Sequence, residues 1–331
     1  MNPSTITAVV PAAGLGKRLR PHTFTAPKGL LPVAGKPILG YILDILKASG
    51  IRKVVLVIGY LGDQIEEYVR KTYDFETIFV EQKEFLGLGY AVNLAREHVT
   101  GPVLIILGDT IIEADIPSFL KSGTSWIGVK EVEDPRRFGV VEVGPDGYIT
   151  RLVEKPSTFV SRKAIVGVYH LVESGLLFDC LSANIKNGIM TAKEFQLTDG
   201  LQLMIEKGAR MTAVPIADWY DCGKVETLLE TNRFLLGKAN PPVPSLAGVV
   251  FNDYVSVGRD VKLVNCVIGP HVSIGNGVEM ENVVIRDAIV NDEAVVKNVV
   301  VDGSVIGRGA VMVGGRRRIN LGDYSEILLS E

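Results

Sequence analysis

The segment that follows the first apolar run of the chain combines small residues with cations. Residues with little or no side chain let backbone amides approach an anion closely, and neighbouring cations add positive charge. We therefore predict a loop that cradles phosphate groups, with a plain tight turn as the alternative when the loop is viewed alone. The segment is Pro11–Pro21, its small residues are Ala12, Ala13, Gly14 and Gly16, and its first cations are Lys17 and Arg18.

Two familiar phosphate-binding motifs do not fit this chain. The dinucleotide fingerprint fails because Leu19 stands where its third glycine belongs and Pro21 interrupts the helix that should begin there. The Walker loop fails because Gly35 and Lys36 are followed by Pro37 instead of Ser or Thr.

Two aspartates follow apolar runs that are typical of strands. Asp109 comes after Val103–Leu107, and Asp221 comes after a run that ends at Trp219. Carboxylate oxygens are the ligands that Mg²⁺ prefers, so the pair predicts a magnesium site. For either aspartate viewed alone, a helix cap or a turn former is the alternative. The histidines are scattered without metal-ligand spacing, so we expect no catalytic histidine here; they are His22, His98, His170 and His271.

The elements that would position these residues alternate along the first two thirds of the chain. Short β-rich runs alternate with stretches whose apolar residues lie three and four apart. This pattern predicts an α/β domain with a mostly parallel sheet covered by helices, whose ligands bind at the carboxyl ends of the strands. The predicted strands are Ile6–Val10, Lys53–Ile58, Thr77–Val80 and Val103–Leu107, and the predicted helices are Ile38–Ala48, Asp63–Lys71 and Gly89–His98.

The pattern of residue types along the chain changes near residue 238. Three prolines within Lys238–Ser245 exclude a helix or a central strand. Beyond them, short apolar rungs and Gly-bearing turns repeat with a period near six, which is typical of a hexapeptide β-solenoid of about four coils. An antiparallel sandwich is the alternative. We predict a first domain at residues 1–237, a Pro-rich linker at 238–247 and a solenoid domain at 248–331.

Composition narrows the class of protein. The chain has 331 residues, 47% of them hydrophobic and 22% charged, which is typical of globular domains. Its net charge of -3 makes nucleic acid a poor default partner. The three cysteines form no close pair, which fits a reducing compartment, and no apolar run is long enough for a membrane span. Without a secretory leader either, we expect a cytoplasmic protein.

The motifs occur together in an order that resembles the sugar-1-phosphate nucleotidyltransferases, the family of glucose-1-phosphate thymidylyltransferase and related uridylyltransferases. The likeness covers the whole chain and begins with Ala12–Pro21 and Ala26–Leu39. It implies nucleotidyl transfer from UTP or dTTP to a sugar 1-phosphate with Mg²⁺, a Rossmann-like first domain, a left-handed β-helix and a homo-oligomer. Further matches are Gln82 with Leu86-Gly87, Leu107–Thr110, Phe138–Glu142, Glu154–Pro156, Glu194–Asp199 and Trp219–Gly223.

The resemblance also implies a role for each matching residue. On the nucleotide side, Asp109 and Asp221 would hold the metal. Arg18 and Lys28 would grip the triphosphate and stabilise the charge on the leaving pyrophosphate. Gln82 would read the edge of a pyrimidine, and Gly87 would let the base approach the backbone.

On the sugar side, the matching residues lie in the middle of the sequence. Gly139 matches a backbone contact to the hexose, Glu154 a carboxylate that accepts from sugar hydroxyls, and Lys155 a cation on the sugar phosphate. One departure concerns Ala192-Lys193, which stand where several relatives carry Arg-Gly.

Two rival functions remain open from the sequence. The first adds acyltransferase activity in the solenoid, with His271 as general base, although a turn histidine beside Pro270 is the plainer interpretation. The second is a regulatory homologue without catalysis. Arg316–Arg318 is interpreted as a solvated end of the solenoid, with a phosphate or subunit contact as the alternative. The choice between UTP and dTTP and the identity of the sugar stay open.

Overall fold

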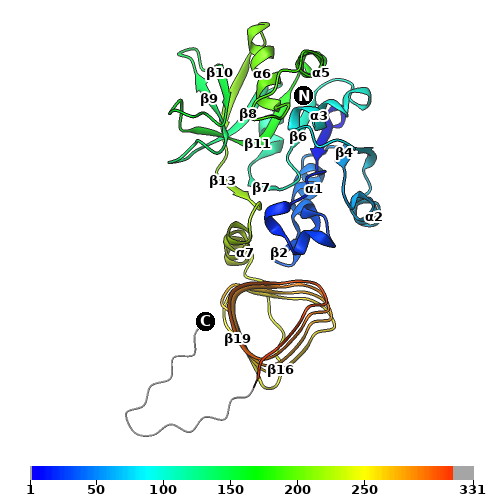
Figure 1. Cartoon of the computed structure of the whole chain (residues 1–331), viewed down its shortest axis with the longest axis vertical. Coiled ribbons are helices and arrows are strands. Elements are labelled where there is room, and N and C mark those ends of the chain that lie inside the picture. Colours follow the sequence, from blue (N-terminus) through cyan, green and yellow to red (C-terminus); the bar gives the residue numbers. More distant parts are fainter. Residues whose placement is uncertain (1, 316–331) are drawn as a thin grey trace. The chain divides into compact units, whose positions relative to one another are not determined.

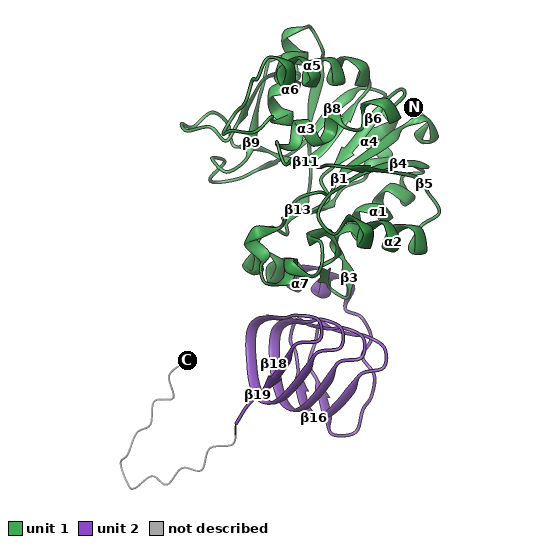
Figure 2. Ribbon diagram, turned by 45° about the vertical axis from the view of Figure 1, so that its right-hand side comes forward, with its two compact units in different colours: residues 1–231 green, residues 232–331 purple. Residues whose placement is uncertain are grey.

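The computed structural model describes residues 2–315, so the Arg316–Arg318 run lies outside the described residues. The contacts divide the chain into two compact units, one up to Thr231 and one from Asn232 (Figure 2). This division falls inside helix α7, Val225–Ala239. Between the end of α7 at Ala239 and the next strand at Val249 there is no helix or strand. The predicted linker at 238–247 therefore contains the end of α7 and an irregular segment.

The first unit is built on a parallel sheet segment in the order β6-β1-β4-β5 (Figure 2; β4 and β6 are also labelled in Figure 1). Every neighbouring pair in this segment is parallel, as the alternating pattern predicts. Consecutive residues of β1 contribute to opposite hydrophobic clusters, Val9 to one and Ala8 and Val10 to the other. Both faces of the sheet are therefore covered at its centre, which explains why β1, β4 and β6 are almost continuously apolar. The edge strand β5 begins and ends with an exposed glutamate. The strands are β1 (Thr7–Pro11), β4 (Lys53–Ile58), β5 (Glu76–Glu81) and β6 (Val103–Ile106).

Helices bury apolar stripes on each face of this sheet. The cluster that includes Val9 takes residues from the helices α3, α5 and α6, and the cluster that includes Val10 takes residues from α1, α2 and α4. The expected helix Gly89–His98 is shorter in the structure, because it ends at Asn93 and a separate 3₁₀ turn follows. The helices are α1 (Ile38–Ala48), α2 (Gly62–Thr72), α3 (Leu88–Asn93), α4 (Ile116–Lys121), α5 (Ser174–Lys186) and α6 (Leu197–Glu206).

Beyond β6 the sheet continues with mostly antiparallel strands. Strand β11 pairs antiparallel with β6, β8 and β9, and β9 pairs antiparallel with β10. Two short ribbons lie off this sheet, β2 with β3 and β7 with β13. The strands of this region are β2 (Pro32–Val33), β3 (Lys36–Pro37), β7 (Thr110–Glu113), β8 (Ser125–Glu131), β9 (Gly139–Val143), β10 (Ile149–Glu154), β11 (Lys163–Leu171), β12 (Met211–Pro215) and β13 (Asp218–Asp221).

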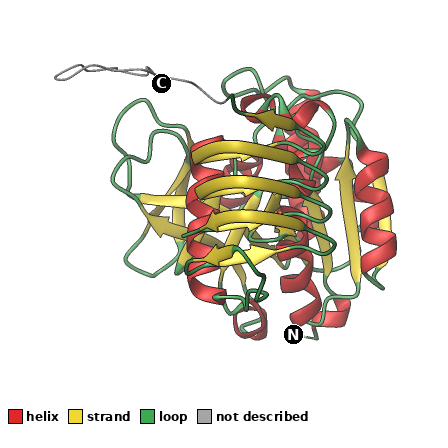
Figure 3. Cartoon of the chain, turned by 90° about the horizontal axis from the view of Figure 1, so that it is seen from below, coloured by secondary structure: helices red, strands yellow, loops and turns green. Residues whose placement is uncertain are grey.

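The second unit stacks parallel strands as rungs (Figure 3). Val250 pairs with Val267, Val267 with Val284, and Val284 with Val300, so the chain returns to the same position every 16 or 17 residues. These valines face outward, and the inward-facing apolar side chains of the coils form one buried cluster. These contacts confirm the repeating parallel coils. The strands are β14 (Val249–Phe251), β15 (Val255–Val257), β16 (Lys262–Ile268), β17 (Val272–Ile274), β18 (Glu279–Val290), β19 (Val295–Ile306) and β20 (Val311–Val313).

His271 lies in a crowded turn of the second unit. Its φ is 60°, its ring stacks on Tyr254 with centroids 5.1 Å apart, and its Nδ1 lies 3.4 Å from the Asp287 carboxylate. The same carboxylate accepts from Arg233 Nε at 3.0 Å, and the backbone oxygen of His271 accepts from Asn232. These contacts give the histidine a packing role within the second unit.

In the described part of the chain, no helix combines the length and the apolar character that crossing a membrane requires. The three cysteines, Cys180, Cys222 and Cys266, are buried free thiols.

Candidate functional site

A cavity of about 620 Å³, here called the loop cavity, opens at the carboxyl ends of β1 and β6. The position at Gly14 is open, since an added Cβ there would meet nothing within 4 Å. The structure thus gathers the predicted phosphate loop and the predicted base-reading residues around one space. The sequence-predicted residues that line the loop cavity are Ala12, Ala13, Gly14, Gly16, Lys17, Arg18, Lys28, Gln82, Gly87 and Asp109.

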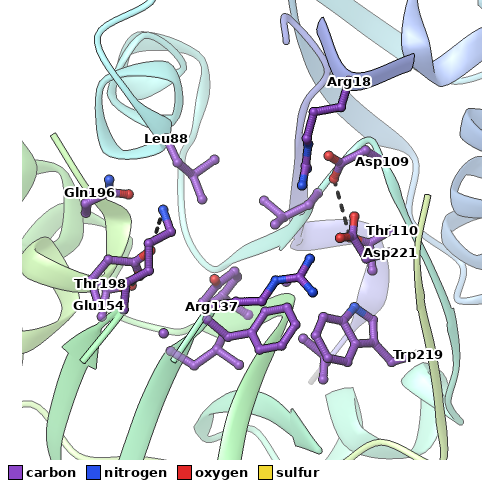
Figure 4. Close-up of a pocket in the computed structure, with 18 residues that line it drawn as sticks. Arg18, Leu88, Asp109, Thr110, Arg137, Glu154, Gln196, Thr198, Trp219 and Asp221 are labelled. Atoms are coloured by element: carbon purple, nitrogen blue, oxygen red, sulfur yellow. Dashed lines mark hydrogen bonds and ion pairs between the residues drawn. The ribbon is translucent and has the colours of Figure 1, made fainter. Parts of the chain in front are cut away.

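A second cavity of about 390 Å³, here called the sheet cavity, lies over β9 and β11 (Figure 4). Arg18 and Asp109 line both cavities, so the two spaces adjoin at these side chains. The remaining predicted residues that line the sheet cavity are Gly139, Glu154, Lys155 and Asp221.

The ribbon of β7 and β13 brings the two aspartates together. Asp221 pairs in register with Thr110, and the backbone N–H of Cys222 donates to the backbone oxygen of Asp109 at 3.2 Å. A Cβ added to Gly223 would meet Arg18 Nη2 at 2.6 Å and Asp221 Oδ1 at 2.9 Å, so these two groups lie beside the same small residue. The strand ends therefore hold one guanidinium beside two carboxylates.

The donor set at Asp109 and Asp221 fits a hard cation that takes its other ligands from substrate. Both groups supply carboxylate oxygens, the ligands that Mg²⁺ prefers, and Mg²⁺ sites commonly use one or two carboxylates together with water and phosphate oxygens. Among residues 2–315, no group of three or more His, Cys, Asp and Glu side chains forms a complete metal cage.

Lys28 is buried against Asp109. Its side chain is 10% exposed and its Nζ lies 2.6 Å from Asp109 Oδ2. A buried ammonium without a partner is costly, so Asp109 stabilises the charged lysine inside the loop cavity. Burial, the larger cause, raises the pKa of the neighbouring Cys222 thiol to about 12, with the charges of Asp109 and Asp221 adding to it. That thiol is therefore protonated and unsuited to act as a nucleophile.

Glu154 is fixed from two sides in the sheet cavity. Thr198 Oγ1 donates to its Oε2 at 2.8 Å, and Lys155 Nζ lies 3.2 Å from its Oε1. Gly139 must be small, because a Cβ there would meet Glu154 Oε2 at 2.9 Å and Thr198 Oγ1 at 3.1 Å. A glycine at this position therefore lets Glu154 and Thr198 pack directly against the β9 backbone.

Gln82 and Gly87 also line the loop cavity. Gln82 is 6% exposed, and its Nε2 donates to the backbone oxygen of Glu84 at 2.9 Å. Gly87 has a φ of 113°, and a Cβ there would meet the backbone oxygen of Phe195 at 2.7 Å. Only glycine fits this conformation, which lets the segment around residue 195 pack along the loop.

Several lining residues were not among the predicted site residues. Trp219 stacks edge-on against Phe138 with centroids 4.8 Å apart, and Arg137 precedes that phenylalanine in the lining of the sheet cavity. Gln196 and Thr198 line the same cavity. All of them flank or lie within motifs quoted from the sequence, but their side-chain directions depend on pairings between distant segments.

Two buried polar atoms near the sheet cavity have no hydrogen-bond partner among the described residues. They are Trp219 Nε1 and Asp199 Oδ2. Burial raises the pKa of the Asp199 carboxyl, and the negative charge of Glu154 adds to this effect.

The chain is similar to proteins of known family. The family model described as nucleotidyl transferase matches residues 7–238. The chain is 32% identical over 258 residues to a bifunctional protein GlmU from Methanococcus vannielii, covering 76% of this chain and 59% of that relative. It is 31% identical over 323 residues to a glucose-1-phosphate thymidylyltransferase from Streptomyces griseus, covering 94% of this chain and 89% of the relative.

A solved structure agrees with this likeness. The crystal structure of a UDP-glucose pyrophosphorylase complexed with UDP-glucose aligns with a TM-score of 0.62 and 27% identity, over 70% of this chain and 98% of that one. The family match spans more than two thirds of the chain and contains every sequence-predicted site residue. On this evidence the chain belongs to the nucleotidyl transferase family.

Proposed function

We propose that this protein transfers a nucleotidyl group from UTP or dTTP to a hexose 1-phosphate and releases pyrophosphate. The observation that carries the proposal is the pair of adjoining cavities that share Arg18 and Asp109. The loop cavity offers small residues and cations for a triphosphate, and the sheet cavity offers Glu154 and Lys155 for a sugar phosphate. The named relatives act as thymidylyltransferase and UDP-glucose pyrophosphorylase, which favours pyrimidine nucleotides.

The reaction joins the two ligands where the cavities meet. An oxygen of the sugar phosphate attacks the α-phosphorus of the triphosphate, and a new P–O bond forms while the bond to the β-phosphate breaks. The electron pair of that bond leaves with pyrophosphate, so no covalent enzyme intermediate is required. The protein acts by positioning the two phosphates and by balancing charge.

Individual residues have separate roles in this proposal. Lys28 and Arg18 stabilise the negative charge that develops on the triphosphate side. Glu154 accepts hydrogen bonds from sugar hydroxyls, Lys155 pairs with the sugar phosphate, and Gln82 contacts the base. Asp109 and Asp221 would hold Mg²⁺, which supplies positive charge to the phosphate oxygens.

The molecular context is also a proposal. The left-handed sense of the coils and a homo-oligomer rest on the family resemblance. A cytoplasmic location rests on the cysteine usage and the apolar runs of the sequence, and the domain limits 1–237, 238–247 and 248–331 rest on the Pro-rich segment and the repeat that follows it. These features do not affect the chemistry assigned to the cavities.

The direct test is a panel of nucleoside triphosphates against hexose 1-phosphates, with Mg²⁺ and with detection of both pyrophosphate and the sugar nucleotide. We expect product with UTP or dTTP and at least one hexose 1-phosphate. Pyrophosphate released without sugar phosphate, or no product from any pair, would contradict the proposal.

A further inference from the structure

Gln196 is a buried polar side chain that the proposed chemistry has not used. It is 6% exposed, it precedes the first residue of α6, and it lines the sheet cavity. A buried amide carries donors and an acceptor, and each needs a partner from the protein or from a ligand.

The orientation of this amide is fixed by its neighbours. Nε2 donates to Glu194 Oε2 at 3.0 Å and to the backbone oxygen of Thr191 at 3.3 Å. Both partners are acceptors, so the nitrogen must face them and the oxygen must face the other way. Figure 4 shows the oxygen of Gln196 directed toward the cavity.

The segment that carries Gln196 is held firmly in place. The backbone N–H of Phe195 donates to Leu86 at 2.8 Å, and the N–H of Gly89 donates back to Phe195 at 2.8 Å. The preceding turn contains Ala192 and Lys193 at φ of 52° and 66°, a left-handed conformation that is uncommon for residues other than glycine. Such backbone persists only where its surroundings enforce it.

Glu154 and Gln196 differ in whether their acceptor oxygens already have partners in the sheet cavity. Both oxygens of Glu154 already face partners, Thr198 and Lys155. Gln196 Oε1 accepts no hydrogen bond that the structure records within residues 2–315. A ligand that fills this cavity therefore meets an acceptor that is already oriented and unpaired.

We propose that Gln196 determines sugar specificity by accepting a hydrogen bond from a hydroxyl or an amide N–H of the sugar ring substituents, with Glu194 as the residue that positions it. This proposal rests on the proposed function, since it assigns the sheet cavity to the sugar. It adds the chemical requirement that the accepted sugar carries a hydrogen-bond donor at the position facing Gln196. Because Glu194 also lines the loop cavity, the pair links the surfaces of both cavities.

The test combines Gln196→Leu with a set of deoxyfluoro hexose 1-phosphates, in which fluorine replaces one hydroxyl at a time and cannot donate. For the wild type, one analogue is expected to raise the KM for sugar phosphate about tenfold, because the buried acceptor loses its partner. In Gln196→Leu, the KM for the parent hexose 1-phosphate rises about tenfold with kcat little changed, and the penalty for that analogue disappears.

A matched control and a second variant complete the design. Gln202→Leu removes an amide on the same helix that bonds Leu152 and Glu206 outside the sheet cavity, so it should leave the KM for sugar phosphate unchanged. Glu194→Gln is expected to keep the fold but to let the Gln196 amide rotate by 180°. It should therefore raise the KM for sugar phosphate by a smaller factor than Gln196→Leu does. Calorimetric titration of the hexose 1-phosphate measures the same differences without turnover.

The outcomes separate the two proposals. Suppose that the wild type turns over but Gln196→Leu has an unchanged KM for sugar phosphate, or shows the same penalty for the fluorinated analogue as the wild type. Either result overturns the role of Gln196 alone. Absence of turnover by the wild type with every pair overturns the proposed function and this inference with it.

Discussion

The contact between Lys28 and Asp109 places one buried cation in the loop cavity, to which we assign the triphosphate. Lys28 lines only the loop cavity, whereas Lys155 lines only the sheet cavity. The sequence resemblance could assign these two lysines to different substrates, and the structure supports that division by placing them in different cavities. What the sequence could not provide is the ion pair that holds Lys28, because its partner lies 81 residues away.

Truncation of the two lysines should therefore have different effects on substrate binding and turnover. A charge-assisted contact contributes on the order of 1.5 to 3 kcal/mol, which corresponds to a roughly 10- to 150-fold effect. Lys155→Ala should chiefly raise the KM for sugar phosphate, while Lys28→Ala should weaken nucleotide binding and lower kcat. Calorimetric titration of the nucleotide into both variants is the measurement. Equal loss of nucleotide affinity in the two variants would show that the division is wrong.

Asp199 gives a prediction about pH. Its buried Oδ2 lacks a partner among the described residues and burial raises its pKa, so the folded state binds a proton more tightly than the unfolded state. Its contribution to stability is therefore present below the unfolded pKa of about 3.9 and is lost as pH rises through the folded pKa. Asp199→Asn removes the cost of ionisation and should raise the melting temperature at pH 7.5, with the difference shrinking toward pH 4. A constant difference across this range would contradict the assignment.

At the scale of elements, the alternating strands and helices of the first hundred residues were predictable from local periodicity, and the parallel pairings confirm them. The antiparallel extension was not predicted, because β11 pairs with β8, β9 and β6, and partners so distant in sequence leave no local pattern. Gln196 was missed for the same reason. Gln196 lies inside the motif Glu194–Asp199, but its burial depends on packing against a loop that lies more than a hundred residues earlier in the sequence.

Strand β11 also carries a titratable group in the core. His170 is fully buried, its Nδ1 bonds the backbone oxygen of Thr124 at 2.9 Å, and its Nε2 has no partner in the described part of the chain. Burial lowers the pKa of this histidine, so it stays neutral in the folded protein near pH 7.

This histidine should make the first unit sensitive to mild acid. The unfolded state gains a proton near the ordinary pKa of about 6.5 while the folded state does not, so stability is retained above that pH and falls below it. His170→Phe should reduce the loss of unfolding free energy between pH 7 and pH 5, measured by urea denaturation at each pH. An identical loss in the variant and the wild type would assign the acid sensitivity to other groups.

At the scale of the whole molecule, the chain joins a nucleotidyl transferase unit to a stack of parallel coils. All of the predicted site residues lie in the first unit, so the proposed chemistry is complete there without a residue from the coils. The period of the solenoid could be predicted because each turn of chain repeats the same pattern of apolar residues and glycines. The exact division at Thr231 could not, since α7 continues through it as one helix.

The central claim is direct transfer from the triphosphate to a sugar phosphate, and isotope exchange tests it most directly. Labelled pyrophosphate is incubated with the full chain, Mg²⁺ and unlabelled UTP or dTTP, with and without a hexose 1-phosphate. We predict that label enters the triphosphate only when the sugar phosphate is present, because the reverse reaction needs the sugar nucleotide. Exchange without any sugar phosphate would reveal a covalent nucleotidyl-enzyme, and no exchange with any combination would remove the proposed reaction altogether.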